Sequence, residues 1–451
     1  MSPVPVPNST TPFWRTELHE LDSHRTTPDL PTDCDILIIG AGFAGAALAY
    51  HMYDDNPTPP SVVILEAREA CSGATGRNGG HMKPDVYYQV PKYIKKYGVK
   101  AAIDVARFEA SQVQAVKELV QKENIDCDFV LTRACDATLD PELARDTHNA
   151  FTELQKSGVA NLKDVFYAHG KDAEQLSGVK GALSCFTFTA GHVWPYKMVL
   201  HLLSTAVKKG ANLQTNTPVT RVSETALPDG RWLVETARGN INAKKLLFAT
   251  NGYTAHLAPQ FQGKIVPVRG ICSRITVPKD RPVPFLPYTY SIRHGAGMYD
   301  YLIPRPDGSI IVGGAKPRFW HDRSQWYNVS DDSKLIEPAV SHFDGLMQRT
   351  FRGWDDSGAT TDRVWTGIMG WTSDFMPYVG NVPGKPNQMI LAGFSGHGMP
   401  LILLCAKAIV QMLRQGSKFE ETGVPEIFRA TEERLKSTKN EILGSHSQPR
   451  L

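Results

Sequence analysis

The sequence has no apolar run of the ~20 residues that a membrane-spanning helix requires. The two most apolar stretches are residues 35–50, which contain several glycines, and residues 401–413, which Lys407 interrupts. We therefore expect no membrane span. The N-terminal residues 1–32 lack the basic and then apolar pattern of a secretory signal peptide. We interpret them as an extension that lies on the surface or is partly disordered.

A strong excess of charge of one sign is also missing. The 49 Lys and Arg residues stand against 46 Asp and Glu residues, which gives a formal net charge of +3. The basic residues are scattered, and their one compact cluster, Lys92, Lys95 and Lys96, is typical of a solvated helix face. The sequence thus predicts no nucleic acid or other polyanion as a partner.

Cysteine is scarce and has no pattern. The seven cysteines are odd in number, widely spread, and never spaced as C-x-x-C. This excludes a disulfide framework and gives no indication of a metal site, so a reducing compartment fits best. We expect a cytoplasmic protein. The last residues, 449–451, faintly resemble a peroxisomal tripeptide address, which leaves the peroxisome as an alternative.

The most informative stretch begins with a short apolar run at residues 35–39, which predicts a buried parallel strand. Gly40, Gly42 and Gly45 follow at the spacing G-x-G-x-x-G, and a helical pattern continues to residue 55. In such a unit the glycines permit a tight turn, a close approach to a pyrophosphate, and close packing of helix on strand. The first residues of the helix, Phe43 and Ala44 among them, present free N–H groups.

A second apolar run, residues 61–65, is followed by Glu66 and Ala67. Glu66 lies about 20 residues after the last glycine, where an acidic side chain can accept hydrogen bonds from a ribose. The glycine triplet alone could be a structural turn. Strand, glycines, helix, strand and acid in this order predict dinucleotide binding.

The segment Cys71–His81 is rich in glycine and polar side chains, which suits the wrapping of a phosphorylated ligand in loop backbone. Its run Gly-Ala-Thr-Gly-Arg-Asn-Gly-Gly-His resembles the flavin loop of the D-amino-acid-oxidase-like flavoproteins, of the γ-glutamylputrescine oxidase and glycine oxidase type. The resemblance extends from about residue 33 to about residue 415. It implies FAD as the cofactor, held by Ser72, Thr75, Arg77, Asn78, Gly79 and Gly80.

The resemblance also assigns later segments to the cofactor. Val219 matches a position that touches adenine, and Thr250, Asn251 and Gly252 match a segment beneath the cofactor. Gly370 lies in a following strand. A strand, a glycine turn and the start of a helix then follow in the same order as in the first motif. The resemblance assigns this segment to the isoalloxazine end of the cofactor, with Gly393, Ser395, Gly396, His397, Gly398 and Met399.

The implied fold class is α/β (α+β overall), with a Rossmann-like FAD-binding domain interleaved with an antiparallel-sheet substrate domain. We expect residues 33–100, 186–256 and 362–416 in the FAD-binding domain. Residues 101–185 and 257–361 would form the substrate domain, and residues 417–451 a C-terminal tail with a short helix near 426–437. Periodicity predicts further helices at 92–122 and 140–156.

Two departures from the resemblance bear on the substrate. Glycine oxidases and near relatives clamp the substrate carboxylate with arginine, which pairs a carboxylate bidentately. This chain has Met369 and Gly396 where those arginines are expected. A primary or secondary amine therefore fits better than a simple α-amino acid. The family's flavin-tethering cysteine is also missing from residues 368–371, so we expect non-covalent FAD, with Cys71 as the one cysteine that could alter this.

The leading hypothesis is an FAD amine oxidase that converts a C–N bond to the imine and reduces O₂ to H₂O₂. His397, Tyr301 and His81 are the candidate catalytic residues. His397 could instead cap its turn, and Tyr301 could serve packing alone. Alternatives are a dehydrogenase that passes electrons to a quinone or carrier, and a non-enzymatic binding protein of this fold. The intact flavin loops disfavour the last.

Overall fold

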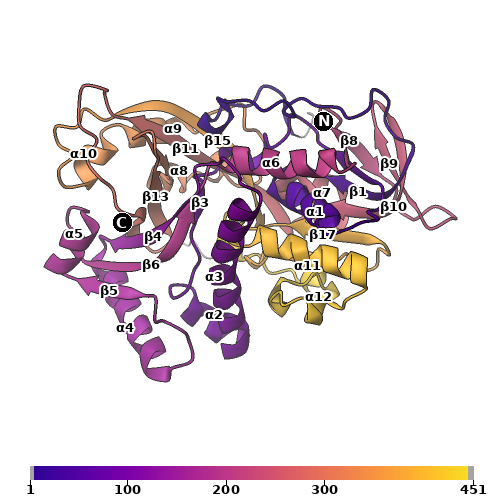
Figure 1. The fold of residues 1–451 in the computed structure, drawn as a ribbon. Helices are drawn as coiled ribbons and strands as arrows, with labels where there is room; N and C mark the ends of the chain where they lie inside the picture. The colour runs from indigo at the N-terminus through magenta and orange to yellow at the C-terminus, as the bar shows by residue number, and fades with distance from the viewer. Residues whose placement is uncertain (1–4, 445–451) are drawn as a thin grey trace.

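The computed structural model describes residues 5–444, and two β-sheets organise it (Figure 1). The terminal residues 449–451, which resemble a peroxisomal address, lie outside the described residues. Among the helices of residues 5–444, none is long and apolar enough to cross a membrane. All seven cysteines are described, and each is a buried free thiol.

The first sheet has the strand order β16-β17-β10-β1-β2-β7, with β9 and β8 joined to β10. Strands β7, β2, β1, β10 and β17 run parallel, which is the Rossmann-like core that the glycine motif predicts. The bounds are β1 Asp33–Ile39, β2 Val62–Leu65, β7 Asn212–Gln214, β8 Val219–Val222, β9 Trp232–Thr236, β10 Gly239–Phe248, β16 Tyr378–Asn381 and β17 Gln388–Ala392.

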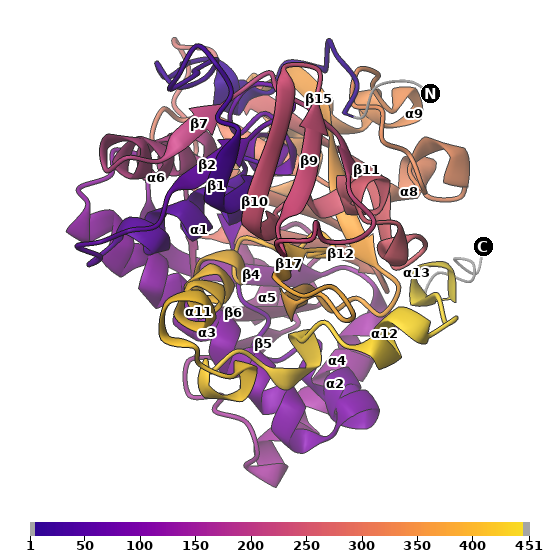
Figure 2. The ribbon, with the colours of Figure 1, turned by 90° about the vertical axis from the view of Figure 1, so that its right-hand side faces the viewer.

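Three helices pack together beside this sheet: α1 Phe43–Tyr53, α6 Pro195–Lys208 and α11 Ile402–Gln415 (Figure 1). Helix α1 lies between the other two, and nearly all of its residues are buried. Strands β8 and β9 form an antiparallel meander with the first part of β10 (Figure 2). The parallel strands are thereby covered, as a central apolar sheet requires.

The second sheet has the order β15-β11-β14-β13-β12-β4-β6-β3, with β5 beside β6, and is antiparallel except where β12 meets β4. The bounds are β3 His81–Met82, β4 Val130–Thr138, β5 Phe166–His169, β6 Ser184–His192, β11 Ile265–Thr276, β12 Thr289–Gly295, β13 Met298–Pro304, β14 Ile310–Gly313 and β15 Thr360–Thr372. The expected α/β architecture with two sheets is confirmed. Strands β6 and β15 belong to this sheet, although the expected boundaries placed most of their residues in the FAD-binding domain.

The expected helix 92–122 is two helices, α2 Val90–Tyr97 and α3 Val99–Lys122. The break falls at Gly98, whose φ of +85° no continuous helix can accommodate. The predicted C-terminal helix is also shorter than expected. The remaining helices are α4 Pro141–Ser157, α5 Lys171–Ser177, α7 Thr254–Leu257, α8 Lys316–Phe319, α9 Glu337–Val340, α10 Leu346–Thr350, α12 Glu432–Lys436 and α13 Glu441–Gly444.

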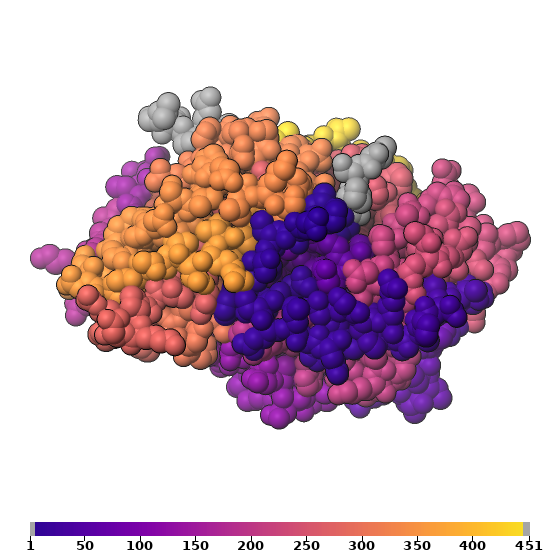
Figure 3. All heavy atoms as spheres, turned by 90° about the horizontal axis from the view of Figure 1, so that it is seen from above, coloured from indigo at the N-terminus to yellow at the C-terminus, as the bar shows by residue number. Residues whose placement is uncertain are grey.

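We expect the N-terminal segment either to lie on the surface or to be partly disordered, and its described residues agree with the first alternative. From residue 5 onwards it lies along one face of the molecule, where Figure 3 shows it in indigo beside the orange residues of the second sheet. Phe13 and Trp14 are buried, and Trp14 is fully so. The Trp14 indole N–H donates to the carbonyl oxygen of Asn78. Aromatic side chains inside a polar, proline-rich segment are the reason it packs.

Candidate active site

A cavity of about 860 Å³ is lined by residues of both sheets. Its lining includes Gly42 and Glu66, which follow β1 and β2. It also includes Tyr301 of β13, Trp371 of β15 and His397, which lies in the turn before α11. The cavity therefore connects the predicted dinucleotide motif with the predicted catalytic residues.

The three motif glycines have different physical roles. Gly40 has a φ of +108°, and a Cβ there would lie 2.6 Å from the carbonyl oxygen of Ala249. A Cβ at Gly45 would lie 1.8 Å from the carbonyl oxygen of Gly40, so this position allows only glycine. A Cβ at Gly42 would meet only the Thr75 hydroxyl, at 3.3 Å. Gly42 lines the cavity, which leaves its backbone open to a ligand.

Glu66 is fixed at the cavity wall by backbone groups. The N–H of Ala41 donates to its Oε2 at 2.8 Å, and the N–H of Arg68 donates to its Oε1 at 3.1 Å. A carboxylate has about four acceptor sites, so two remain for a ligand's hydroxyl groups. Ala67 and Val219 line the cavity beside it.

Two hydrogen bonds fix the turn between β17 and α11. The N–H of Gly393 donates to the side-chain oxygen of Asn251 at 3.0 Å, and the N–H of Ser395 donates to the carbonyl of Gly370 at 2.7 Å. Gly396 has a φ of +79°, a conformation that glycine adopts without strain. Helix α11 begins at Ile402, later than the expected start near Met399.

Two buried side chains of helix α3 contact the same turn. Gln112 is fully buried; its amide N–H donates to the carbonyl of Met399, and its amide oxygen accepts from the N–H of Leu404. Three residues earlier, the carboxylate of buried Glu109 lies 2.7 Å from the Nε2 of His397. Burial opposes protonation of His397, but the Glu109 carboxylate outweighs it and raises the pKa of the imidazole.

Residues 35–412 match one protein family, DAO, which is described as FAD dependent oxidoreductase. The chain belongs to this family. It is 24% identical over 386 residues to gamma-glutamylputrescine oxidoreductase of Escherichia coli (strain K12), covering 84% of each chain. It is 22% identical over 395 residues to glycine oxidase of Bacillus licheniformis, covering 84% of this chain and 92% of that one. The solved structure of glycine oxidase from Geobacillus kaustophilus superposes with a TM-score of 0.71 at 19% identity, covering 89% and 99%.

The glycine turn and the residues that line the cavity fit FAD. The glycine turn presents bare backbone, and Gly42 as N-cap has no side chain to cap α1. The N–H of Phe43, expected to be free, donates to the hydroxyl of Thr75 at 3.1 Å, which leaves the other N–H groups of the first turn for a pyrophosphate. Most of the residues that we expected at the cofactor line the cavity: Gly40, Gly42, Phe43, Ala44, Glu66, Ala67, Thr75, Arg77, Asn78, Gly79, Val219, Thr250, Asn251, Ser395, Gly396, His397, Gly398 and Met399.

Six expected cofactor residues are absent from the cavity lining: Gly45, Ser72, Gly80, Gly252, Gly370 and Gly393. They lie behind the residues that form the cavity wall. Gly252 and Gly370 pack backbone against backbone, since a Cβ on Gly370 would lie 2.7 Å from the nitrogen of Gly252. Gly80 is enclosed by Val193, Trp14 and Ile303. The five glycines are closely packed, since a Cβ on any of them would lie within 2.8 Å of another atom, whereas Ser72 accepts a hydrogen bond from Arg77 through its carbonyl.

Arg77 has partners that the sequence did not indicate. Its Nε donates to the carbonyl of Ser72 at 2.7 Å and lies 3.3 Å from the carboxylate of Asp332. Its Nη1 donates to the carbonyl of Thr366 and to the hydroxyl of Thr10. The guanidinium thus fastens the flavin loop to the second sheet and to the N-terminal segment. Asp332 is a residue that no motif suggested.

The polar groups of the other two candidate catalytic residues, Tyr301 and His81, already have hydrogen-bond partners. The ring of Tyr301 fills the space above Gly79 and Gly313, and its hydroxyl lies 3.5 Å from the thiol of Cys272. The Nε2 of His81 lies 2.6 Å from the hydroxyl of Thr289. Burial lowers the pKa of His81 well below its ordinary value, so the ring is neutral. Both side chains line the cavity.

The structure adds charged residues that sequence reasoning missed. The buried carboxylate of Asp136 pairs with Lys83 and with Arg293, each at 3.0 Å, and accepts a hydrogen bond from the Tyr87 hydroxyl at 2.9 Å. Lys316 also lines the cavity. These residues come from separate strands and loops, and only a signal at the end of β14, Gly-Gly-Ala-Lys, could have drawn attention to Lys316.

Proposed function

We propose that this chain oxidises the C–N bond of a primary or secondary amine to the imine, with FAD as the electron acceptor. The amine loses two electrons and two protons, and O₂ gains both to become H₂O₂. FAD, when bound, supplies the two-electron chemistry. Two of the relatives, named for a putrescine derivative and for glycine, support a substrate with a C–N bond.

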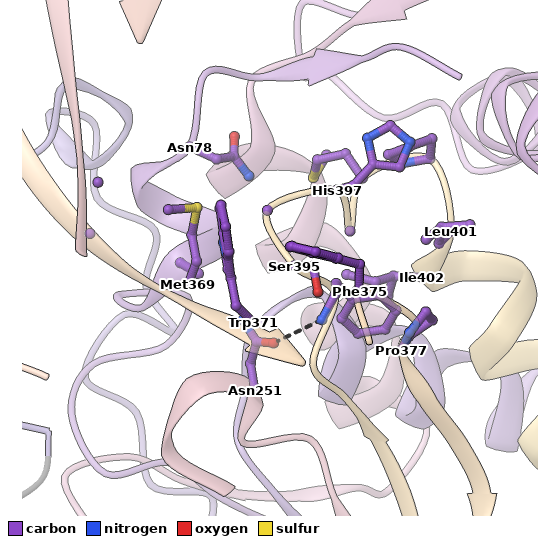
Figure 4. Close-up of a pocket in the computed structure, with 18 of the residues that line it drawn as sticks. Asn78, Asn251, Met369, Trp371, Phe375, Pro377, Ser395, His397, Leu401 and Ile402 are labelled. Atoms are coloured by element: carbon purple, nitrogen blue, oxygen red, sulfur yellow. Dashed lines mark hydrogen bonds between the residues drawn. The ribbon is translucent and has the colours of Figure 1, made fainter. Parts of the chain in front are cut away.

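The observation that carries the choice of an amine is the wall beside the Gly396 turn. Met369 and Trp371 alternate along β15 and therefore share a face, on which Met369 stands in place of the expected arginine (Figure 4). A Cβ on Gly396 would lie 3.2 Å from the sulfur of Met369 and 3.4 Å from the indole nitrogen of Trp371. Within 4 Å of that Cβ, the described residues contribute no guanidinium that could clamp an α-carboxylate.

The chain's own residues would act by orientation and desolvation. An apolar wall disfavours an ammonium ion, so it lowers the pKa of a bound amine and favours the neutral form that is oxidised. His397 and the N–H groups before α11 would stabilise negative charge on the reduced cofactor. The protein thereby needs no strong base.

A substrate panel tests the proposal. We expect purified holoenzyme to release H₂O₂ and consume O₂ with a primary or secondary amine, and to turn over glycine or D-alanine far more slowly. Stopped-flow reduction by the amine followed by slow reoxidation in air would instead identify a dehydrogenase. Turnover of a simple α-amino acid equal to that of the best amine would contradict the choice of substrate.

A further inference from the structure

Residues 5–10, which we call the N-terminal strap, border the cavity beside the residues that are expected to hold adenosine. Pro5 lines the main cavity together with Glu66 and Val219. A second cavity of about 610 Å³ lies against the strap, whose Pro5, Pro7, Asn8 and Ser9 form one of its walls. The two cavities share five lining residues, Pro5, Ala67, Arg68, Val219 and His256, so they adjoin at this place.

The second cavity reaches the protein surface. Pro7 and Asn8 of the strap are exposed, and so are Asn216 and Thr220 on the opposite wall. In Figure 3 the indigo N-terminal residues border a hollow on this face of the molecule. A passage from the cofactor site to solvent therefore runs between the strap and residues 216–220.

Two arginines from cofactor-binding segments hold the strap. The Nη1 of Arg68 donates to the carbonyl of Val6 at 3.1 Å, and the Nη2 of Arg77 donates to the hydroxyl of Ser9. The fully buried carboxylate of Asp332 pairs with both guanidinium groups, at 2.9 and 3.3 Å. The strap is thus fastened to the segment after β2 and to the flavin loop, which are the walls of the expected dinucleotide site.

Thr10 makes the most contacts in the strap. Its N–H donates to the carbonyl of Asp332 at 2.8 Å, and its hydroxyl accepts from the Nη1 of Arg77 and from the N–H of Thr366, each at 3.1 Å. The next residue, Thr11, is exposed, and its hydroxyl has no hydrogen-bond partner among residues 5–444. Thr10 therefore acts as the latch of the strap.

The strap is held more weakly than the segment that follows it. None of residues 5–10 is buried, and none belongs to a helix or strand, whereas Phe13 and Trp14 are buried in the core. Segments with few buried apolar contacts open locally at a small cost in free energy. The strap can thus move away from the cavity while Phe13 and Trp14 stay packed.

We propose that the N-terminal strap is the gate through which FAD enters and leaves its site. Opening of residues 5–10 about the packed Phe13 and Trp14 uncovers the passage beside Val219. The inference concerns the cofactor alone and holds whatever the substrate and the electron acceptor are. A gate slows entry and exit by the same factor, so it changes the rates of association and dissociation and leaves the dissociation constant unchanged.

Cofactor exchange tests the latch. Mixing holoenzyme with excess 5-deaza-FAD, whose absorption differs from that of FAD, measures the dissociation rate, and flavin fluorescence after mixing FAD with apoprotein measures association. We expect Thr10→Val to raise both rates about tenfold, because the hydroxyl's hydrogen bonds are lost. The dissociation constant should change by less than about twofold. Thr11→Val is the matched control and should leave both rates as in wild type.

Pro7→Gly opens the same gate without touching the hydrogen bonds of the strap. Pro7 is exposed, and glycine increases the conformational freedom of the open strap. We expect both rates to rise about two- to fivefold. Pro57→Gly is the matched control, because Pro57 is also exposed but lies in the loop between α1 and β2, away from both cavities. It should leave both rates unchanged.

Hydrogen exchange followed by mass spectrometry gives a readout that does not use the cofactor. The amides of residues 6–11 should exchange faster in Thr10→Val and in Pro7→Gly, while those of residues 71–81 exchange as in wild type. Unchanged rates of FAD entry and exit in both variants would overturn the proposal. A faster dissociation with unchanged association would make the strap a binding contact, and faster exchange at residues 71–81 would assign the effect to the flavin loop; either result would also overturn the gate.

Discussion

The Nε2 of His397 and the Oε2 of Glu109 lie 2.7 Å apart, although the two residues are 288 positions apart in the chain. The same carboxylate oxygen accepts the N–H of Asp85 at 2.6 Å. The side chain of His397 remains 42% exposed toward the cavity, whereas that of Glu109 is buried. The imidazole is thus oriented by a fixed, buried partner, as catalytic histidines commonly are.

The first prediction concerns the rate of flavin reduction. His397→Ala should slow anaerobic reduction by a good amine while FAD stays bound, because a group near the developing charge is removed. Glu109→Gln should have a smaller effect in the same direction, since it perturbs the orientation of the imidazole. Stopped-flow absorbance measures both. Reduction rates equal to wild type in both variants would place the catalytic end of the cofactor elsewhere.

The second prediction concerns pH and stability. Because the folded protein raises the pKa of His397 above its ordinary value of 6.5, the charged pair adds stability that is fully present below pH 6.5. That contribution is lost as the pH rises through the raised value. The melting temperature of wild type should therefore exceed that of His397→Gln by more at pH 6 than at pH 9. Glu109→Gln should remove this dependence, and a difference that grows with pH would contradict the pairing.

The third prediction concerns the dinucleotide end of the site. Gly42→Val should obstruct the pyrophosphate and crowd the Thr75 hydroxyl, and Glu66→Ala should remove a ribose acceptor and leave the N–H groups of Ala41 and Arg68 unpaired. Each should weaken FAD binding about tenfold or more. Fluorescence titration of the apoprotein measures this. Gly295→Ala is the control, because a Cβ there meets nothing within 4 Å.

The fourth prediction concerns the N-terminal segment. Trp14 is fully buried against Phe13 and Trp194, and it hydrogen-bonds the flavin loop at Asn78. Trp14→Ala should destabilise the protein by about 3–5 kcal/mol and release FAD. Trp14→Phe should lose about 1 kcal/mol through the hydrogen bond. Leu18→Ala, at a residue that is 62% exposed, should change neither denaturant unfolding nor flavin content.

The fifth prediction is that FAD is bound without a covalent link. The Cys71 thiol is fully buried, burial raises its pKa, and it is absent from the cavity lining. A thiol in that state is a poor nucleophile. Heat or acid should therefore release all flavin into the supernatant, and Cys71→Ala should bind FAD as wild type does. Flavin that stays with the precipitated chain would disprove the expectation.

Local sequence determined the cofactor end of this protein. A buried strand, three glycines and a helix must form a βα unit, because strand and helix can pack closely only where Gly45 has no Cβ. Glu66 follows from the same reasoning, since parallel strands end at one edge of the sheet. These features depend on residues close together in the chain, so spacing was enough to place them.

The tertiary structure alone decided the catalytic and substrate end. Glu109 reaches His397 from a helix, Asp332 reaches Arg77 from a loop, and Trp371 and Lys316 meet although they lie on different elements. None of these pairs has a spacing that a sequence pattern could reveal, because the two members of each lie on different elements far apart in the chain. The burial of Trp14 is of the same kind: its partners, Trp194 and the carbonyl of Asn78, become neighbours only after folding.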